Sequence, residues 1–304
     1  MKRFLKSLSV LLICPIFAAG IEQIAEVTHP ELDEMSGIVA STYEDIFWVH
    51  NDSGDSARIF AVKVDGSVVL PRSIQAFFPN RSPDMWEGYS VDNAWHQDWE
   101  DIAIANGTLF IADVGNNANA RRDLGIYVVN EPNPNYVHKT RAAQFLPIRY
   151  PDQFQYPAKQ WHFDCEAVFT FNGKLYFLTK HRQPGKPMGW ESGTKLYRLD
   201  TRRTDQENVL TLVDRHTGIA LATGADVSPD SDHLAVLTYS RLWVFDRPKH
   251  GDKWLQSSAR VLDLDRNLVQ QNEAVAWETN NSLLITNENR AIFRVSLDAL
   301  EPTL

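Results

Sequence analysis

Short apolar runs separated by polar turns recur along the chain, and one strand pattern returns five times. In each copy a small or charged residue is followed by a branched aliphatic residue, an aromatic residue, any residue and another aliphatic residue. The copies begin at Arg58, Gly125, Lys195, Arg241 and Ala291. Repetition of one pattern at a regular spacing predicts a repeat architecture built from β-strands.

Each copy has further apolar strands before and after it. The preceding strands, each ending in a polar turn, cover 46–49, 109–112, 175–179, 234–238 and 283–286. Still earlier strands begin at Ser36, Glu100, Glu166, Gly224 and Glu273. Candidates for a fourth strand lie at 68–77, 143–150, 209–213 and 259–264. The chain therefore predicts four short strands in each repeating unit.

Four strands per unit, without an amphipathic helix of note, predict an all-β fold, a β-propeller of four-stranded antiparallel blades. We count five blades, and six stay open if a long insertion contains another. The last unit lacks a fourth strand, which residues 21–27 would supply, closing the ring so that no sheet edge is left unpaired. A pair of β-sandwiches is the alternative, but five repeats in one register favour the propeller.

The first twenty residues resemble a targeting signal. Basic residues, an apolar run and small residues follow one another: Lys2, Arg3 and Lys6, then 8–17, then Ala18, Ala19 and Gly20. This order predicts a signal peptide over 1–20, a single propeller domain over 21–304 and a periplasmic or secreted protein. A membrane anchor is less favoured, because the apolar run is about half of the ~20 residues that span a bilayer.

Composition narrows the classes of protein. With 43% apolar and 23% charged residues, the chain is typical of a folded globular protein. A net charge of −9 argues against non-specific nucleic-acid binding, which needs a basic surface. Removal of the signal peptide takes away three basic residues and leaves 27 against 39 acidic ones, a net charge of −12. Cys165 would then be the single thiol, and we expect it to be buried and inert.

The repeat predicts where polar side chains meet. In each blade the loop before the inner strand and the loop between the second and third strands open on the same face of the ring, which we call the top face. Three blades carry a glutamate at the same inner-strand position, Glu100, Glu166 and Glu273. Blade one has Ser36 there, and blade four has Gly224 with Asp226 close by. The three glutamates should converge on the mouth of the central channel.

Converging carboxylates repel one another and need a cation, a basic side chain or raised pKa values. Oxygen ligands suit Ca²⁺ or Mg²⁺. The predicted metal ligands are Glu100, Glu166, Glu273, Asp113 and Asn287. The alternative, of equal weight, is that the glutamates bond the backbone of adjacent blades or channel water.

Other polar residues of the top-face loops are candidates for contact with a ligand. They are Asn51, Asp52, Trp99, Asn116, Arg121, Lys180 and His181. No histidine spacing indicates a zinc site, and no Gly-x-Ser-x-Gly or phosphate-binding glycine loop is present, which disfavours a common serine hydrolase or a nucleotide enzyme.

Two long loops carry exposed-looking aromatic residues. The segment 79–99 contains Trp86, Tyr89, Trp95 and Trp99, and is long enough to cover the top face as a lid or to stack on a sugar or peptide. The segment 183–193 would complete such a cover. The alternative is that these rings pack under the loop as a satellite cluster.

Several motifs together resemble a known group of proteins. They cover 34–38, 50–55, 98–103, 113–117, 223–230 and 272–276. In these the chain resembles secreted bacterial propellers with NHL/YWTD-like repeats. The inner-strand glutamate is also similar to the metal-binding glutamate of gluconolactonase- and paraoxonase-type propellers, and esterase-like phytases share the layout. This resemblance implies further ligands near Asp226, Asp113 and Asn287, while Ser36 departs from it.

Two classes of function follow. The favoured one is a propeller that binds a small molecule, glycan or protein partner on its top face, with no nucleic acid and no membrane involved once the signal is removed. The alternative is a divalent-metal-dependent hydrolase of esters, lactones or phosphoesters, with Asp101 or Asp226 as the base. Propellers host both, so the fold does not decide between them.

Overall fold

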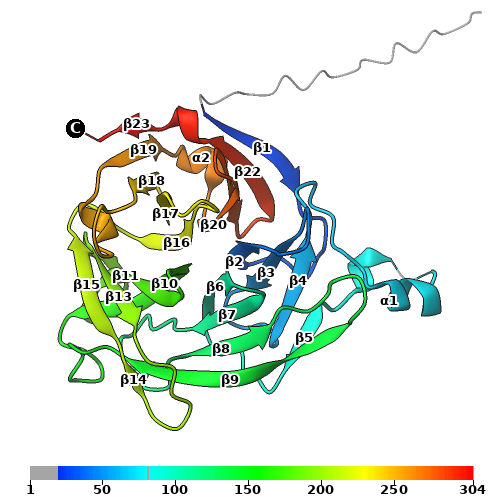
Figure 1. Cartoon of the computed structure of the whole chain (residues 1–304), viewed down its shortest axis with the longest axis horizontal. Helices are drawn as coiled ribbons and strands as arrows, with labels where there is room; N and C mark the ends of the chain where they lie inside the picture. The colour runs from blue at the N-terminus through cyan, green and yellow to red at the C-terminus, as the bar shows by residue number, and fades with distance from the viewer. Residues whose placement is uncertain (1–19, 81, 304) are drawn as a thin grey trace, which may run out of the picture.

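The computed structural model describes residues 20–80 and 82–303. Five four-stranded blades form a ring (Figure 1), and we call the region that their inner strands enclose the channel. Each inner strand contacts the inner strands of both neighbouring blades, which closes the ring. The predicted signal peptide lies almost wholly outside the described residues, and its cleavage stays a prediction. Among the described residues no helix has the length and apolar character needed to cross a membrane.

The strands of each blade follow one another outward from the channel. Blade one has β2 (Met35–Ala40), β3 (Phe47–Asn51), β4 (Arg58–Val62) and β5 (Tyr89–Asp92). Blade two has β6 (Trp99–Ala105), β7 (Thr108–Asp113), β8 (Gly125–Asn130) and β9 (Lys139–Arg149). Blade three has β10 (Trp161–Phe171), β11 (Lys174–Gln183), β13 (Thr194–Leu199) and β15 (Thr211–His216). Blade four has β16 (Ala222–Val227), β17 (His233–Thr238), β18 (Arg241–Asp246) and β19 (Ala259–Asp263).

Blade five contains β20 (Asn272–Thr279), β21 (Ser282–Asn287) and β22 (Ala291–Ser296), and its outer strand is β1 (Ile21–Glu26). β1 pairs antiparallel with β22, so the first strand of the described chain lies beside the last strand but one in a single blade (Figure 1). The predicted closure of the ring by the N-terminal strand is therefore confirmed. The five-bladed count is confirmed with it.

Smaller elements lie outside the four-stranded pattern of the blades. The remaining strands are β12 (Lys186–Trp190), β14 (Asn208–Val209) and β23 (Glu301–Pro302), and the helices are α1 (Arg72–Phe77), α2 (Arg266–Val269), η1 (Pro83–Met85), η2 (Trp254–Gln256) and η3 (Leu297–Ala299). β5 also pairs in parallel with β9, which joins blades one and two into one continuous sheet.

Apolar side chains fill the layers between neighbouring blades. Blade one packs on blades two and five, blade two on blade three, three on four and four on five. Local sequence shapes the hairpins: Asn106 and Gly107 turn β6 into β7 with positive φ angles of 49° and 69°, and Asn172 and Gly173 repeat this turn in blade three. Asn-Gly suits a type I′ turn because both of its central residues need positive φ.

The fourth strand of blade one differs from the prediction. Of the predicted strand at 68–77, Val68 forms only an isolated bridge to Val62, and the rest contains α1, which has no buried residue. The strand is β5, where Tyr89 and Val91 are buried and Ser90 and Asp92 are exposed. The alternating apolar face of β5 completes the blade, and the exposed α1 has no such face.

The predicted aromatic lid is also wrong for most of its residues. Trp86, Tyr89 and Trp99 are buried, and the Tyr89 ring packs edge-on against Trp86 and Trp48. Only Trp95, 74% exposed, reaches solvent. The alternative of rings packed beneath a loop therefore describes this segment.

A β-bulge recurs where each inner strand starts. In all five blades the register between the first and second strands slips by one residue, at Ser36, Glu100, Glu166, Thr223 and Glu273. A bulge leaves one residue outside the ladder and re-aims its side chain. The residue of blade four equivalent to the glutamates is thus Thr223, where the sequence indicated Gly224.

Candidate functional site

The bulge positions bring Glu100, Glu166 and Glu273 to one end of the channel, as predicted, and all three are buried. Ser36 and Thr223, at the other two positions, use their hydroxyl groups to hold the next blade. Ser36 Oγ donates to the Glu100 carbonyl at 2.7 Å, and Thr223 Oγ1 donates to the Asn272 carbonyl at 3.1 Å. The mouth therefore presents three carboxylates and two engaged hydroxyls.

Glu166 has cationic partners. Lys180 Nζ lies 2.7 Å from Glu166 Oε2, and Arg182 Nη2 donates to Glu166 Oε1 at 3.4 Å. Arg182 Nε also donates to the buried Asp164. Burial alone would lower the pKa of Lys180, but the surrounding carboxylates, Glu166 first, hold that pKa well above its usual range. Lys180 thus stays charged and neutralises this part of the mouth.

Glu273 is held by neutral donors. The Tyr239 hydroxyl donates to Glu273 Oε1 at 2.9 Å, and Gln271 Nε2 donates to the same oxygen at 3.1 Å. Burial raises the pKa of Glu273 to about 7, although Lys180 and these two hydrogen bonds act in the opposite direction. We call Glu166 and Glu273, with Lys180, Arg182 and Tyr239, the paired flank of the mouth.

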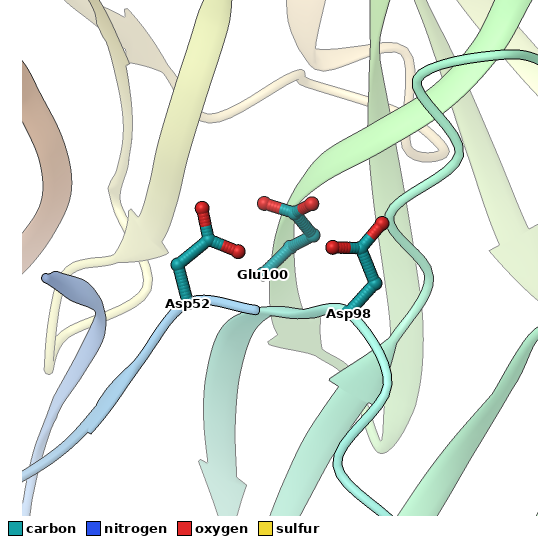
Figure 2. A group of neighbouring side chains, drawn as sticks. All are labelled: Asp52, Asp98 and Glu100. Atoms are coloured by element: carbon teal, nitrogen blue, oxygen red, sulfur yellow. The ribbon is translucent and has the colours of Figure 1, made fainter. Parts of the chain in front are cut away.

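Glu100 lies in a different environment (Figure 2). Ligand atoms of Asp52, Asp98 and Glu100 all lie within 4.8 Å of one another, and we call these three residues the acidic flank. Glu100 is 4% exposed and, within residues 20–80 and 82–303, its carboxylate has no hydrogen bond or ion pair. Burial and then the neighbouring charges of Glu166 and Asp52 raise the pKa of Glu100 well above its ordinary value. Burial and then Asp52 raise that of Asp98 to about 7.

Gly115, which has no side chain, lies against one side of the acidic flank. A methyl group on Gly115 would lie 2.1 Å from Glu100 Oε1 and 2.3 Å from Asp98 Oδ2. The glycine therefore leaves room for both carboxylates. Three close carboxylates with one fully buried member fit a hard cation that takes oxygen ligands, such as Ca²⁺ or Mg²⁺.

The acidic flank differs from the predicted set of metal ligands. Glu100 is the one residue that belongs to both. Asp113 Oδ1 forms an ion pair with Arg121 Nη2 at 2.8 Å. Asn287 donates to the Val269 carbonyl at 3.0 Å and accepts from the Ala291 amide at 2.9 Å, so its side chain shapes a turn. Glu166 and Glu273 have the protein partners described above. A role for these four in binding metal stays a prediction.

The predicted ligand-binding residues do not form one surface. Asn116 caps its own loop, accepting from the Ala120 and Arg121 amides at 2.9 Å each. Asn51 Nδ2 donates to the Glu31 carbonyl at 2.6 Å. Trp99 is fully buried against the His50 and His96 rings and is inaccessible to a ligand. Of the predicted residues, Asp52 lies beside Glu100 and Lys180 pairs with Glu166.

The two predicted catalytic residues lie along the inner strands and have structural partners. Asp101 accepts from the Ile102 and Val168 amides at 2.8 Å each. Asp226 accepts from the Val227 and Trp277 amides at 2.9 Å each. Each carboxylate thus ties its strand to the next blade. Burial raises the pKa of Asp226 to about 7, yet a catalytic role for either residue stays a prediction.

Asp98 is the residue that the sequence analysis missed. It stands two positions before Glu100, and across the bulge both side chains turn to the same cluster. The available signal was the run Asp98-Trp99-Glu100-Asp101, in which three acids surround a buried tryptophan.

No family model matches the chain, and no curated protein matches it either. Similar solved structures include a gluconolactonase from Xanthomonas campestris, at 13% identity and a TM-score of 0.40, with 95% of this chain and all of the other covered. A glucose dehydrogenase is similar at 9% identity and a TM-score of 0.48, over 91% of this chain and 99% of the other. The allergen Mala s 1 of Malassezia sympodialis is similar at 12% identity and a TM-score of 0.46, over 92% and 95%. The class of protein, a five-bladed β-propeller, therefore rests on the chain's own strand pairing.

Proposed function

We propose that the chain is a divalent-cation-dependent propeller hydrolase, with the cation held by Asp52, Asp98 and Glu100 and with esters, lactones or phosphoesters as substrates. One observation carries this proposal: the Glu100 carboxylate is buried beside two other carboxylates, and no hydrogen bond or ion pair links it to any residue of 20–80 or 82–303. The equivalent Glu166 and Glu273 both have partners.

The negative charge of the acidic flank explains why we propose a cation there. Burying an uncompensated carboxylate is costly, and two more negative groups within 4.8 Å add repulsion. The cluster has two ways to relieve this: it takes up protons, as the raised pKa values of Glu100 and Asp98 indicate, or it binds a cation. Partial exposure of Asp52 and Asp98 leaves the cluster open to ions from the channel mouth.

The same mouth has groups suited to hydrolysis. A divalent cation there would supply Lewis-acid polarisation of a substrate oxygen or a more acidic water. Glu273, with a pKa of about 7 and a hydrogen bond from Tyr239, has the proton affinity that a general base needs at neutral pH.

A second candidate is a binding propeller in which the cation is only structural. It is favoured by Trp95 and Trp190, which are exposed on the loop before β6 and on β12. Such rings suit a glycan or a protein partner. In either case we propose a periplasmic or secreted protein, based on residues 1–20, and a place among NHL/YWTD-like propellers. Mass spectrometry of the mature N-terminus tests the processing.

The first experiment measures metal content and then Ca²⁺ and Mg²⁺ binding by calorimetry. For the wild type we expect one divalent ion per chain. Glu100→Gln should weaken its affinity at least tenfold, which corresponds to about 1.4 kcal/mol. The matched control is Glu166→Gln, at the same bulge position, which should lower stability through Lys180 and change cation affinity much less than Glu100→Gln does, because Glu166 acts on the acidic flank only through its charge.

Hydrolysis of p-nitrophenyl acetate, a gluconolactone and p-nitrophenyl phosphate, each with and without EDTA, then separates the two candidates. Turnover that EDTA abolishes supports the hydrolase. Cation binding without turnover of any of the three favours the binding propeller. A wild type that binds no divalent ion contradicts both the hydrolase and the acidic-flank site.

A further inference from the structure

A cavity lies on blade three, outside the channel mouth. It has a volume of about 810 Å³ and is walled by the connection from β9 to β10, by His162 and His181, and by the ends of β13 and β15. We call it the rim pocket. Its volume lies in the range of about 300–1,000 Å³ that small-molecule sites occupy.

Strand alternation separates the rim pocket from the mouth. Lys180 and His181 are neighbours on β11, and successive side chains of a strand point to opposite faces. Lys180 therefore pairs with Glu166 at the mouth, while His181 lines the rim pocket.

Two buried polar atoms at the rim pocket have no hydrogen-bond partner in the described parts of the chain. They are His181 Nε2 and Thr194 Oγ1, in residues that are 7% and 1% exposed. Buried polar atoms in native proteins are nearly always hydrogen-bonded, so two exceptions at one cavity point to a partner from outside the chain. Both atoms belong to residues that line the pocket.

Aromatic rings form part of its walls. The imidazoles of His162 and His181 stack with centroids 3.8 Å apart and an angle of 7°, and Glu191 fixes His162 through a 2.8 Å contact to Nε2. Phe154, at the opening, is 81% exposed. Burial, then the charges of His162 and Lys195, lower the pKa of His181 to about 3, so its ring is neutral. Flat rings of this kind suit a planar ligand.

The charge of the rim pocket is positive, although the chain carries −9 overall. Lys195 Nζ forms an ion pair with Asp152 Oδ2 at 2.8 Å, which cancels one charge of each sign. Lys159 and Arg215 also line the pocket, and within the described residues neither side chain has an ion-pair partner. Two cations therefore remain for a ligand.

From these features we propose that the rim pocket binds a small planar anion, a ring that carries a carboxylate or a phosphate group. The ring lies against Phe154 and the stacked imidazoles. Arg215 and Lys159 attract the anionic group, and polar atoms of the ligand satisfy His181 Nε2 and Thr194 Oγ1. The guanidinium of Arg215 suits both anions because it can donate two parallel hydrogen bonds.

Isothermal titration calorimetry with phenyl phosphate and benzoate tests this site, and it is run in EDTA so that no cation at the acidic flank can bind the phosphoester. We expect at least one of the two to bind, and the tighter one identifies the anionic group. Phe154→Ala and Arg215→Gln should each weaken binding about tenfold or more, and both residues are exposed, so the variants should fold. Phe77→Ala and Arg203→Gln, similarly exposed outside the pocket, are the matched controls and should change nothing.

Four results would overturn the proposal. If neither probe binds, the proposed site does not exist. If benzyl alcohol binds as tightly as the probes, the ligand need not be an anion. If inorganic phosphate binds as tightly as phenyl phosphate, the ligand need not contain a ring. Unchanged binding in Phe154→Ala and Arg215→Gln places the probe elsewhere. Glu100→Gln should leave probe binding unchanged, so failure of the rim pocket and failure of the channel-mouth site are distinguishable.

Discussion

The two flanks of the channel mouth begin from the same residue type in the same backbone setting, and they differ in what surrounds it. Glu100 and Glu166 both occupy the bulge at the start of an inner strand. Lys180 lies against Glu166, whereas Asp52 and Asp98 lie against Glu100. One glutamate is thus part of a neutral ion pair and the other part of an uncompensated negative cluster.

The difference arises in the strand ends and loops that reach the mouth. β11 of blade three supplies Lys180 and Arg182 as it reaches the top face. Blade two offers Asp113, already paired with Arg121, and then Gly115, which has no side chain. The repeat therefore sets where a carboxylate stands, and the loop residues set whether it is neutralised. Three experiments test whether the position of a carboxylate and its neutralisation are determined separately in this way.

The largest effect is expected when the paired flank loses its cation. Lys180→Met leaves Glu166 buried without its main partner, and removing one member of a buried ion pair costs about 3–5 kcal/mol. Urea denaturation at pH 7 measures the loss. The double variant Lys180→Met/Glu166→Gln should recover part of it.

Lys174→Met is the control for that experiment. Lys174 lies on β11, the strand that carries Lys180, and pairs with Asp200 but is partly exposed, so its loss should cost about 1 kcal/mol or less. Equal losses of unfolding free energy in Lys180→Met and Lys174→Met would show that burial of the Lys180–Glu166 pair does not increase its contribution to stability.

A smaller effect is expected from pH on the cation-free acidic flank. The pKa of Asp98 is raised to about 7, so the folded chain keeps a proton that the unfolded chain loses near pH 4. Stability from this group is therefore present at low pH and is lost as pH rises toward 7. His50, with its pKa lowered to about 4 by burial, acts in the opposite direction, so the prediction concerns a difference between variants.

In EDTA, the stability of the wild type relative to Asp98→Asn should fall by about 1–3 kcal/mol between pH 5 and pH 7.5. Saturating Ca²⁺ should abolish this fall, because a bound cation favours the ionised carboxylate. A wild type that gains stability over Asp98→Asn across this range in EDTA would contradict the assigned direction.

The smallest change in stability is expected from Gly115→Ala. The added methyl group overlaps the ends of two side chains, which can swing away, so the cost should be about 1 kcal/mol. Displacing Glu100 and Asp98 should nevertheless weaken Ca²⁺ affinity about tenfold. Gly218→Ala, whose methyl group would lie 3.1 Å from the His216 ring, is the control. Unchanged affinity in Gly115→Ala would mean that the two carboxylates do not bind the ion together.

Much of the fold could be predicted from the sequence because strand periodicity is a local property. The aromatic strand pattern and the apolar strands before it predict five blades, and the unpaired last unit points to residues 21–27 as the closing strand, of which 21–26 form β1. The fourth strand of blade one could not be predicted in this way. It is only four residues long and lies beyond α1, among aromatic residues that are also expected in a loop.

The repeat pattern alone places three glutamates at equivalent positions of a ring, so that they meet at one end of its channel. The pairing of Glu166 with Lys180, of Glu273 with Tyr239 and of Glu100 with Asp52 from a different blade is visible only in the folded ring. Coulomb and hydrogen-bond energies depend on separations of a few ångströms between loops. Those separations are fixed by the closure of the ring and by the bulge, which are not local features of any strand.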